Sequence, residues 1–387
     1  MRFWALIGLA VLALGLTGCH STATQKTEAL SAPAVKAGAF IYVPGMSAGA
    51  GDIRAQTRST LDAVALKLKQ AGSGLENACL VNVYLRNAAD FAGMGEVYSS
   101  YFPKDPPARV TVMVNGLPDA GALVEISAIA VPDGAERRIV KPQGWSKSPL
   151  PYSYGVQSGN TVFLAGLISR NGVDNTNVKG DITAQTDYIM GNARAILKEA
   201  NMALDDVAQS RVYITDLANF QAMNAAYRSA FTAAPPARAT VRAGLTNSDY
   251  LVEIAMIAVK DPSRTAINAP GPDGKPGLVN PNFSQAIRVG DRLFVAGLSG
   301  EDEATKGDAR AQTAQAVDKL SRTLNAAGFD LTNAVEGVAY VADPNKFMDV
   351  NAAYRAVFSK DLPALTAVSA DLVAADAEGE FSLIAQK

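Results

Sequence analysis

The chain alternates between stretches with the two-residue hydrophobic period of strands and stretches with the 3.6-residue period of helices. Each cycle begins with a short apolar stretch (39–44, 161–167 and 292–298), then a polar loop and an amphipathic helix that starts at an aspartate. A strand, a second helix and two further strands follow. If a segment before the first stretch also pairs, the order is ββαβαββ. This order predicts an α+β fold, with a mixed sheet and two helices on one face.

The cycle is a true repeat, because two separate anchors recur in one register. The motif Gly-Asp-x-x-Ala-Gln-Thr occupies 51–57, 180–186 and 307–313, and its glutamines are 129 and then 127 residues apart. The positions 109, 238 and 365 are separated by the same 129 and 127 residues. Such long periods indicate whole domains rather than solenoid repeats. We expect domains at 37–133, 134–262 and 281–387, with a Pro/Gly-rich linker at 263–280.

A sheet covered by helices on one face leaves its other face in need of a partner. Three similar sheets in one chain can bury those faces against one another around an approximate threefold axis. The sequence therefore predicts a monomeric pseudo-trimer of three tandem domains.

Charged residues interrupt the last two strands of two of the copies. Pro-Ala-Arg ends at Arg109 and at Arg238, and the strands that follow carry Glu125 and Glu253 within apolar runs. A charge in an apolar strand is costly unless it is paired or faces a functional cavity. We therefore expect these four residues to carry the chemistry, or to form structural ion pairs. The Gly/Asp/Asn-containing turn between the two strands predicts that they form an antiparallel hairpin.

Composition excludes several kinds of site. The 387 residues include one histidine and two cysteines, so a Ser-His-Asp or Cys-His machine and a His/Cys metal site are not expected. The net charge of −2 does not favour nucleic acid as a partner. Any chemistry must use arginine, carboxylates, hydroxyls, backbone groups and water, and we expect neither metal nor cofactor.

The N-terminus indicates export. Residues 1–18 combine an early arginine with an apolar run too short to span a bilayer comfortably, and they end in Leu-Thr-Gly before Cys19. This resembles a bacterial lipobox, in which Cys19 is lipidated, with an ordinary cleaved signal as the alternative. We expect a tether over 19–36 and a lipoprotein of the cell envelope that faces the periplasm. The outer membrane is favoured, because His20 gives no retention signal for the inner one. Cys79 then has no partner and is expected in a strand core.

The joint pattern resembles the Rid family of reactive intermediate deaminases, also known as the YjgF family. The features that match are a glycine after the first core strand, a helix-borne Phe…Asn…Tyr…Phe, Pro-Ala-Arg and Glu-Ile…Ile-Ala, over nearly all of 36–387. The resemblance implies a chorismate-mutase-like fold and sites in the clefts between neighbouring subunits of a trimer. It also implies hydrolysis of imine or enamine intermediates to a 2-oxo acid and ammonia.

The resemblance implies roles for individual residues. It places the family arginine on Arg109 and Arg238, the glutamate on Glu125, Glu253 and Glu380, and the glycine on Gly45, Gly166 and Gly297. It places the N-terminal aromatic on Tyr152 and Phe283, the helix asparagine on Asn224 and Asn351, and the small polar residue on Thr111 and Thr240. Leu365 replaces the arginine of the third copy, Gly95 replaces the asparagine of the first, and Ser31 lies where the first aromatic would align. At most two sites keep the arginine, and Glu380 is expected to be structural.

Three functions follow from these patterns. The first is a hydrolase of the 2-imino acid deaminase type, in which arginine grips a small carboxylate and glutamate positions water. The second is a lipoprotein that binds a small carboxylate metabolite without turnover. The third is a structural pseudo-trimer with vestigial sites. The lipobox argues against the ordinary deaminase, because its pyridoxal-phosphate partners are cytosolic, and export of an acidic chain argues against RNA cleavage.

Overall fold

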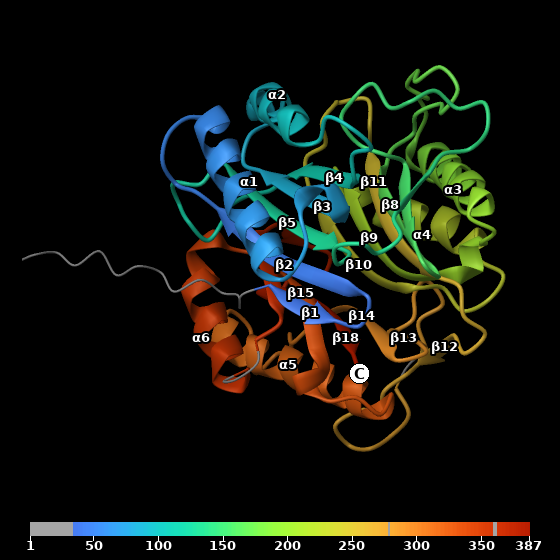
Figure 1. The fold of residues 1–387 in the computed structure, drawn as a ribbon. Helices are drawn as coiled ribbons and strands as arrows, with labels where there is room; N and C mark the ends of the chain where they lie inside the picture. The colour runs from blue at the N-terminus through green and yellow to red at the C-terminus, as the bar shows by residue number, and fades with distance from the viewer. Residues whose placement is uncertain (1–33, 278, 359–361) are drawn as a thin grey trace, which may run out of the picture.

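Each copy forms its own mixed sheet with two long helices along one face, as the computed structural model shows for residues 34–277, 279–358 and 362–387 (Figure 1). Unit 1 contains β1 (Val35–Ala37), β2 (Phe40–Ser47), α1 (Ile53–Gln70), β3 (Ala78–Leu85), α2 (Phe91–Tyr101), β4 (Ala108–Met113) and β5 (Val124–Ala130). Unit 2 contains β6 (Arg138–Val140), β7 (Gly155–Ser158), β8 (Thr161–Leu167), α3 (Ile182–Glu199), β9 (Val207–Ile214), α4 (Phe220–Ser229), β10 (Ala237–Arg242) and β11 (Val252–Val259). Unit 3 contains β12 (Thr265–Ile267), β13 (Ala286–Val289), β14 (Arg292–Ser299), α5 (Ala309–Ala326), β15 (Ala334–Val341), α6 (Phe347–Val357), β16 (Ala364–Ser369), β17 (Asp371–Leu372) and β18 (Gly379–Gln386). The fold class and the three tandem domains predicted from the sequence are confirmed.

The strand order contradicts one prediction. In unit 1 the order is β1-β2-β5-β3-β4, so β3 lies between the strands that carry the arginine and the glutamate. They are not a hairpin. β4 pairs in parallel with β3, because α2 connects the two strands as a crossover, and β5 then pairs antiparallel on the other edge of β3. The connection from Met113 to Val124 resembles a turn in sequence but is long enough to pass to the far side of β3.

The segment 263–280, expected to be a linker, contributes β12 to the third sheet, where β12 pairs with β13. Units 2 and 3 are also joined at a sheet edge, since β17 pairs antiparallel with the end of β10.

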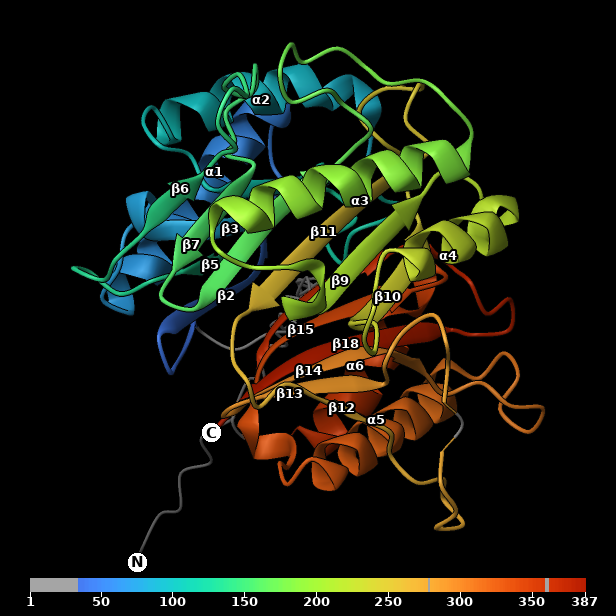
Figure 2. The same cartoon turned by 90° about the vertical axis from the view of Figure 1, so that its right-hand side faces the viewer.

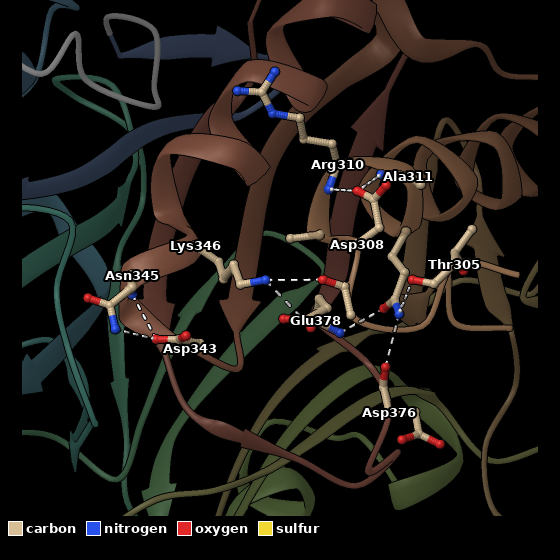
Figure 3. Close-up of polar contacts among 12 residues, drawn as sticks. Thr305, Asp308, Arg310, Ala311, Asp343, Asn345, Lys346, Asp376 and Glu378 are labelled. Atoms are coloured by element: carbon tan, nitrogen blue, oxygen red, sulfur yellow. Dashed lines mark hydrogen bonds and ion pairs between the residues drawn. The ribbon is translucent and has the colours of Figure 1, made fainter. Parts of the chain in front are cut away.

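The repeated Gly-Asp-x-x-Ala-Gln-Thr motif ties each first helix to the strand that carries the glutamate. Asp308 caps α5 by accepting from the backbone N–H groups of Arg310 and Ala311, as the sequence predicts (Figure 3). Gln312 donates to the carbonyl of Asp376 at 3.0 Å and accepts from the N–H of Glu378 at 2.7 Å. The same glutamine contacts recur in the other units. The motif therefore fixes the start of β5, β11 and β18.

Both faces of each sheet are buried. Helices cover the outer faces, and a separate hydrophobic cluster lies between helices and sheet in each unit. A further cluster draws residues from all three units and fills the space where the inner faces meet (Figures 1 and 2). Every residue of β3, β9 and β15 is consequently buried. The expectation that the open faces cover one another is confirmed.

The three units form a closed ring with approximate threefold symmetry. β4 contacts β8, β10 contacts β14 and β16 contacts β2, so each unit presents the same edge to the next. At the centre the equivalent residues Tyr84, Tyr213 and Tyr340 meet, with hydroxyl–hydroxyl distances of 3.5 Å and 3.1 Å between consecutive pairs. These tyrosines mark the pseudo-threefold axis.

One buried ion pair breaks the symmetry near this axis. Arg211 of β9 donates to both carboxylate oxygens of Glu336 on β15, at 2.7 Å and 3.0 Å. Both side chains are less than a tenth exposed. The residues at the position of Arg211 in the other units are Asn82 and Val338, so the pair occurs between units 2 and 3 alone.

In the part of the chain that the structure describes, no helix has the length and apolarity needed to cross a membrane. The predicted signal at 1–18, Cys19 and Ser31 lie outside the described residues. Cys79 is buried and unpaired in β3.

Candidate active site at the junctions between units

The predicted site residues meet across the junctions, each of which takes its arginine strand from one unit and its glutamate from the next. The first junction, between units 1 and 2, brings together Arg109, Thr111, Tyr152, Gly166 and Glu253. The second, between units 2 and 3, brings together Arg238, Thr240, Phe283, Gly297 and Glu380. The third, between units 3 and 1, brings together Leu365, Ala367, Gly45 and Glu125. Glu380 thus faces an arginine although its own unit lacks one, and Glu125 is the glutamate without one.

At the first junction Arg109 is held by aromatic rings. Its guanidinium carbon lies 4.8 Å from the ring centre of Tyr98 and 5.8 Å from that of Tyr152. The side chain is 5% exposed, no described residue accepts a hydrogen bond from it, and Nη1 is buried without a partner. Burial lowers the pKa of Arg109, but a guanidinium stays protonated in proteins. A fixed, unpaired positive charge of this kind favours a bidentate anion such as a carboxylate.

Glu253 faces Arg109 from the other unit. Its Oε1 accepts from the backbone N–H of Thr111 at 3.3 Å. Burial raises the pKa of Glu253 to about 8, and outweighs the opposing effects of that N–H and of Arg109. Gly166 lies in the β-bulge of β8, where a Cβ atom would be 1.9 Å from Oε1 of Glu253. The glycine therefore makes room for the carboxyl group.

All five predicted residues of the first junction line one small pocket, together with Arg170. The pocket encloses about 350 Å³ free of protein atoms, including its opening to solvent. It offers a cation, a proton-bearing carboxyl group and an aromatic wall to a small ligand.

The second junction repeats this arrangement with one added contact. Arg238 donates from Nη2 to the amide oxygen of Asn224 at 2.5 Å and lies 4.9 Å and 5.4 Å from the rings of Tyr227 and Phe283. Burial raises the pKa of Glu380 to about 8, against the effects of Arg238 and the N–H of Thr240. A Cβ on Gly297 would again lie 1.9 Å from this carboxyl group.

The third junction keeps the glutamate and its glycine but not the cation. Leu365 is 2% exposed at the arginine position. Burial raises the pKa of Glu125 to about 8, opposed only by a backbone N–H from Ala367. Asn351, which matches Asn224, accepts from Arg355 at 3.1 Å instead. This junction has no side chain at the arginine position that can bind a carboxylate.

Two serines fix the aromatic wall, and the sequence reasoning missed both. Ser153 donates from Oγ to the carbonyl of Pro106 at 2.6 Å and from its N–H to that of Pro107 at 3.0 Å. Ser284 makes the same two contacts with Pro235 and Pro236, at 2.6 Å and 3.1 Å. Each serine follows Tyr152 or Phe283 directly, so it anchors the aromatic above the neighbouring arginine. The repeated aromatic–serine pair was the available signal.

Other residues of the site were also missed. Tyr98 and Tyr227 pack in the core, and their rings also lie against Arg109 and Arg238. Gly95 explains why Arg109 lacks the amide contact that Asn224 gives Arg238. Arg170 was not singled out, because it has no arginine counterpart in the other copies. Among the described residues, no group of three or more His, Cys, Asp or Glu side chains is placed to hold a metal ion.

Comparison with known proteins finds the same family in all three units. The chain matches the family described as Endoribonuclease L-PSP three times, over residues 21–132, 146–260 and 278–387. It is 39% identical over 110 residues to a RutC family protein of Sulfurisphaera tokodaii, which covers 28% of this chain and 88% of that protein. It is 40% identical over 111 residues to a RutC family protein of Pyrococcus abyssi, which covers 29% of this chain and 87% of that protein.

Solved structures match one unit at a time. Crystal structures of RidA from the Antarctic bacterium Psychrobacter and of E. coli TdcF with bound serine are 27% and 29% identical to the matched part. Each covers 32% of this chain and 99% of the other, with a TM-score of 0.30. The three family matches span most of the chain, and the chain therefore belongs to the Endoribonuclease L-PSP family, the Rid family that its motifs resemble.

Proposed function

We propose that the protein is a Rid-type hydrolase that converts small 2-imino or 2-enamino acids into 2-oxo acids and ammonia, with the first junction as its principal site. One observation carries the proposal. A buried guanidinium without a hydrogen-bond partner and a buried carboxyl group with a pKa of about 8 line the same pocket from two different units.

The two groups divide the work. Arg109 binds the substrate carboxylate through charge-assisted hydrogen bonds, and the ring of Tyr152 limits the positions that the substrate can take. This leaves the imine carbon near Glu253. Binding in a fixed orientation lowers the entropic cost of the addition step, and imines need only a modest acceleration.

Glu253 acts on the proton transfers. Water adds to the C=N carbon and one of its protons passes to the nitrogen, which gives a carbinolamine. The remaining hydroxyl proton then passes to the amino group as the C–N bond breaks, which releases ammonia and leaves the C=O group. A carboxyl group with a pKa of about 8 populates both protonation states near neutral pH. It can therefore accept the proton of water and return it to the departing nitrogen. The N–H of Thr111 keeps Oε1 oriented during both transfers.

The test measures imine hydrolysis directly. 2-Iminobutyrate is generated in situ by an amino-acid oxidase, and 2-oxobutyrate release is compared for wild type, Arg109→Leu, Arg238→Leu and the double variant. Leucine is the natural residue at the third junction, so the fold tolerates it at this position. Loss of a charged hydrogen-bond partner costs about 1.5–3 kcal/mol, or roughly 10- to 150-fold in the rate through the affected junction.

Arg54→Leu, which removes an exposed arginine paired with Glu96 on the outer helices, is the control and should retain the wild-type rate. The double variant should lose this factor at both junctions, so that its rate falls toward the spontaneous one. An unchanged rate in the double variant would refute the proposal. If wild type gives no acceleration but 2-oxobutyrate raises its melting temperature in an Arg109-dependent manner, the protein is a binding lipoprotein instead.

We also propose that Cys19 carries a lipid that anchors the protein to the cell envelope, facing the periplasm. The support is the lipobox sequence before Cys19. Metabolic labelling with a radioactive fatty acid tests this proposal. Labelling should disappear in Cys19→Ser, and a labelled Cys19→Ser protein would contradict it.

A further inference from the structure

A second guanidinium lies in the pocket at the first junction. Arg170 follows β8, four residues after Gly166, and lines the same pocket as Arg109 and Glu253. Its backbone is fixed, because its N–H donates to the carbonyl of Ile168 at 2.7 Å and its carbonyl accepts from Asn192 at 2.8 Å. The reaction derived above makes no use of this residue.

The Arg170 side chain is oriented by a buried tyrosine. Its Nε and Nη2 donate to the hydroxyl of Tyr250 at 3.2 Å and 3.0 Å, and that hydroxyl in turn donates to Asn177. Tyr250 is 1% exposed, so the hydroxyl cannot move freely. Nη1 of Arg170 is buried and has no hydrogen-bond partner. Arg109 and Arg170 thus line one pocket, and each has a buried Nη1 without a hydrogen-bond partner.

Arg170 and Tyr250, the tyrosine that orients it, occur together in unit 2, and neither has a counterpart of the same type in the other two units. The residues four positions after the bulge glycine are Gly49 in unit 1 and Glu301 in unit 3. The residues three positions before the site glutamate, where unit 2 has Tyr250, are Ala122 and Ala377. A lone surface arginine needs no such buried partner, so the pair indicates a built binding position.

We propose that the pocket at the first junction is selective for small dicarboxylates, with one carboxylate on Arg109 and the second on Arg170. The proposal rests on the proposed function for the identity of the reaction and adds the substrate class, a 2-imino dicarboxylic acid. Two guanidinium groups in one small pocket repel each other when it holds no anion, and each carboxylate of the ligand offsets one of them.

The second junction carries the opposite charge at the equivalent position. Oε2 of Glu301 is buried without a hydrogen-bond partner, and the negative charge of Glu301 adds to the rise in the pKa of Glu380. A second carboxylate on a ligand bound to Arg238 would meet this charge and be repelled. The residue four positions after the bulge glycine therefore sets the charge preference of each arginine-bearing junction.

The test compares binding of the stable products 2-oxoglutarate and 2-oxobutyrate by calorimetry in the full chain. All variants carry Arg238→Leu, so that the binding measured is that of the first junction alone. The parent should bind 2-oxoglutarate at least tenfold more tightly than 2-oxobutyrate. Arg170→Met should reduce that ratio at least tenfold, and Arg170→Lys should restore part of it, because lysine supplies the charge without the bidentate geometry. In the Arg109→Leu variant only the second junction keeps its arginine. The additional substitution Glu301→Gln should raise the affinity of this variant for 2-oxoglutarate.

A ratio unchanged by Arg170→Met, or a parent that prefers 2-oxobutyrate, would overturn the proposal. Thermal melting of each variant separates loss of the pocket from loss of the fold. Because the readout is binding, failure of imine hydrolysis with intact dicarboxylate selectivity would refute the proposed function alone. Hydrolysis that is equally fast for monocarboxylate and dicarboxylate imines would refute the selectivity alone.

Discussion

Replacing Gly166 by alanine should disable the first junction while leaving the fold intact. The new Cβ would lie 1.9 Å from Oε1 of Glu253, and real Cβ contacts essentially never fall under 3.0 Å. The carboxyl group must therefore move by about 1 Å, which disturbs its hydrogen bond with the N–H of Thr111. A misplacement of about 1 Å costs roughly 100-fold in rate. The backbone of Gly166 is not in the left-handed region, so alanine adds no backbone strain.

Gly45→Ala is the matched control. Its Cβ would lie 2.2 Å from Oε1 of Glu125, so it produces a similar clash at the junction without an arginine. Both variants should lose about 1–3 kcal/mol of stability through overpacking. Imine hydrolysis is measured in the Arg238→Leu background, with denaturant unfolding in parallel. Gly166→Ala should lower the rate roughly 100-fold, whereas Gly45→Ala should stay within about twofold. Equal losses in both variants, or an unchanged rate in Gly166→Ala, would refute the reasoning.

Three further predictions concern pH, the axis and the aromatic wall. Burial raises the pKa of Glu125 from 4.5 to about 8, so the folded state binds more protons than the unfolded chain in that window and stability falls as pH rises through it. Because the pKa values of Glu253 and Glu380 rise in the same way, Glu125→Gln should reduce the fall in melting temperature by about a third, and an unchanged slope would argue against this. Arg211→Met or Glu336→Leu alone should lower the free energy of unfolding, measured with denaturant, by about 3–5 kcal/mol, because each leaves a buried charge unpaired. The double variant should have nearly the stability of the wild type, and simple additivity of the two losses would contradict this prediction. Ser153→Ala removes one hydrogen bond that holds the Tyr152 segment, worth about 1 kcal/mol, and should weaken 2-oxobutyrate binding about fivefold. Ser99→Ala is the control, and equal weakening in this variant would show that Ser153 does not act by positioning Tyr152.

The repeat made much of the fold predictable. Two anchors in one register located the three units, and the aspartate before each first helix identified the N-cap that the structure contains. The hairpin prediction failed because local sequence gives the length and polarity of a connection but not the strand that lies between its ends. That strand is β3, which pairs with both β4 and β5 through contacts distant in sequence.

The sequence predicts which residues form the site, but not which arginine faces which glutamate. Nothing local indicates that Glu253 serves Arg109 or that Glu380 serves Arg238, because the direction of the ring decides which unit follows which. Arg170 was missed for another reason. Comparison of repeats selects positions that the copies share, whereas Arg170, Tyr250 and Glu301 are positions where the copies differ. A search for charged residues unique to one copy would have found two of them.

Covalent linkage of the units allows different residues at equivalent positions near the axis, which a ring of identical subunits does not. In a homotrimer, any residue placed near the axis appears there three times. Three copies of unit 2 would bring three Arg211 guanidinium groups into one dry space with no carboxylate to neutralise them. The Arg211–Glu336 pair can form only because equivalent strands of the three units have different sequences in this chain. The fusion thus allows the second unit to carry at the axis a residue that a homotrimer of that unit would leave unneutralised.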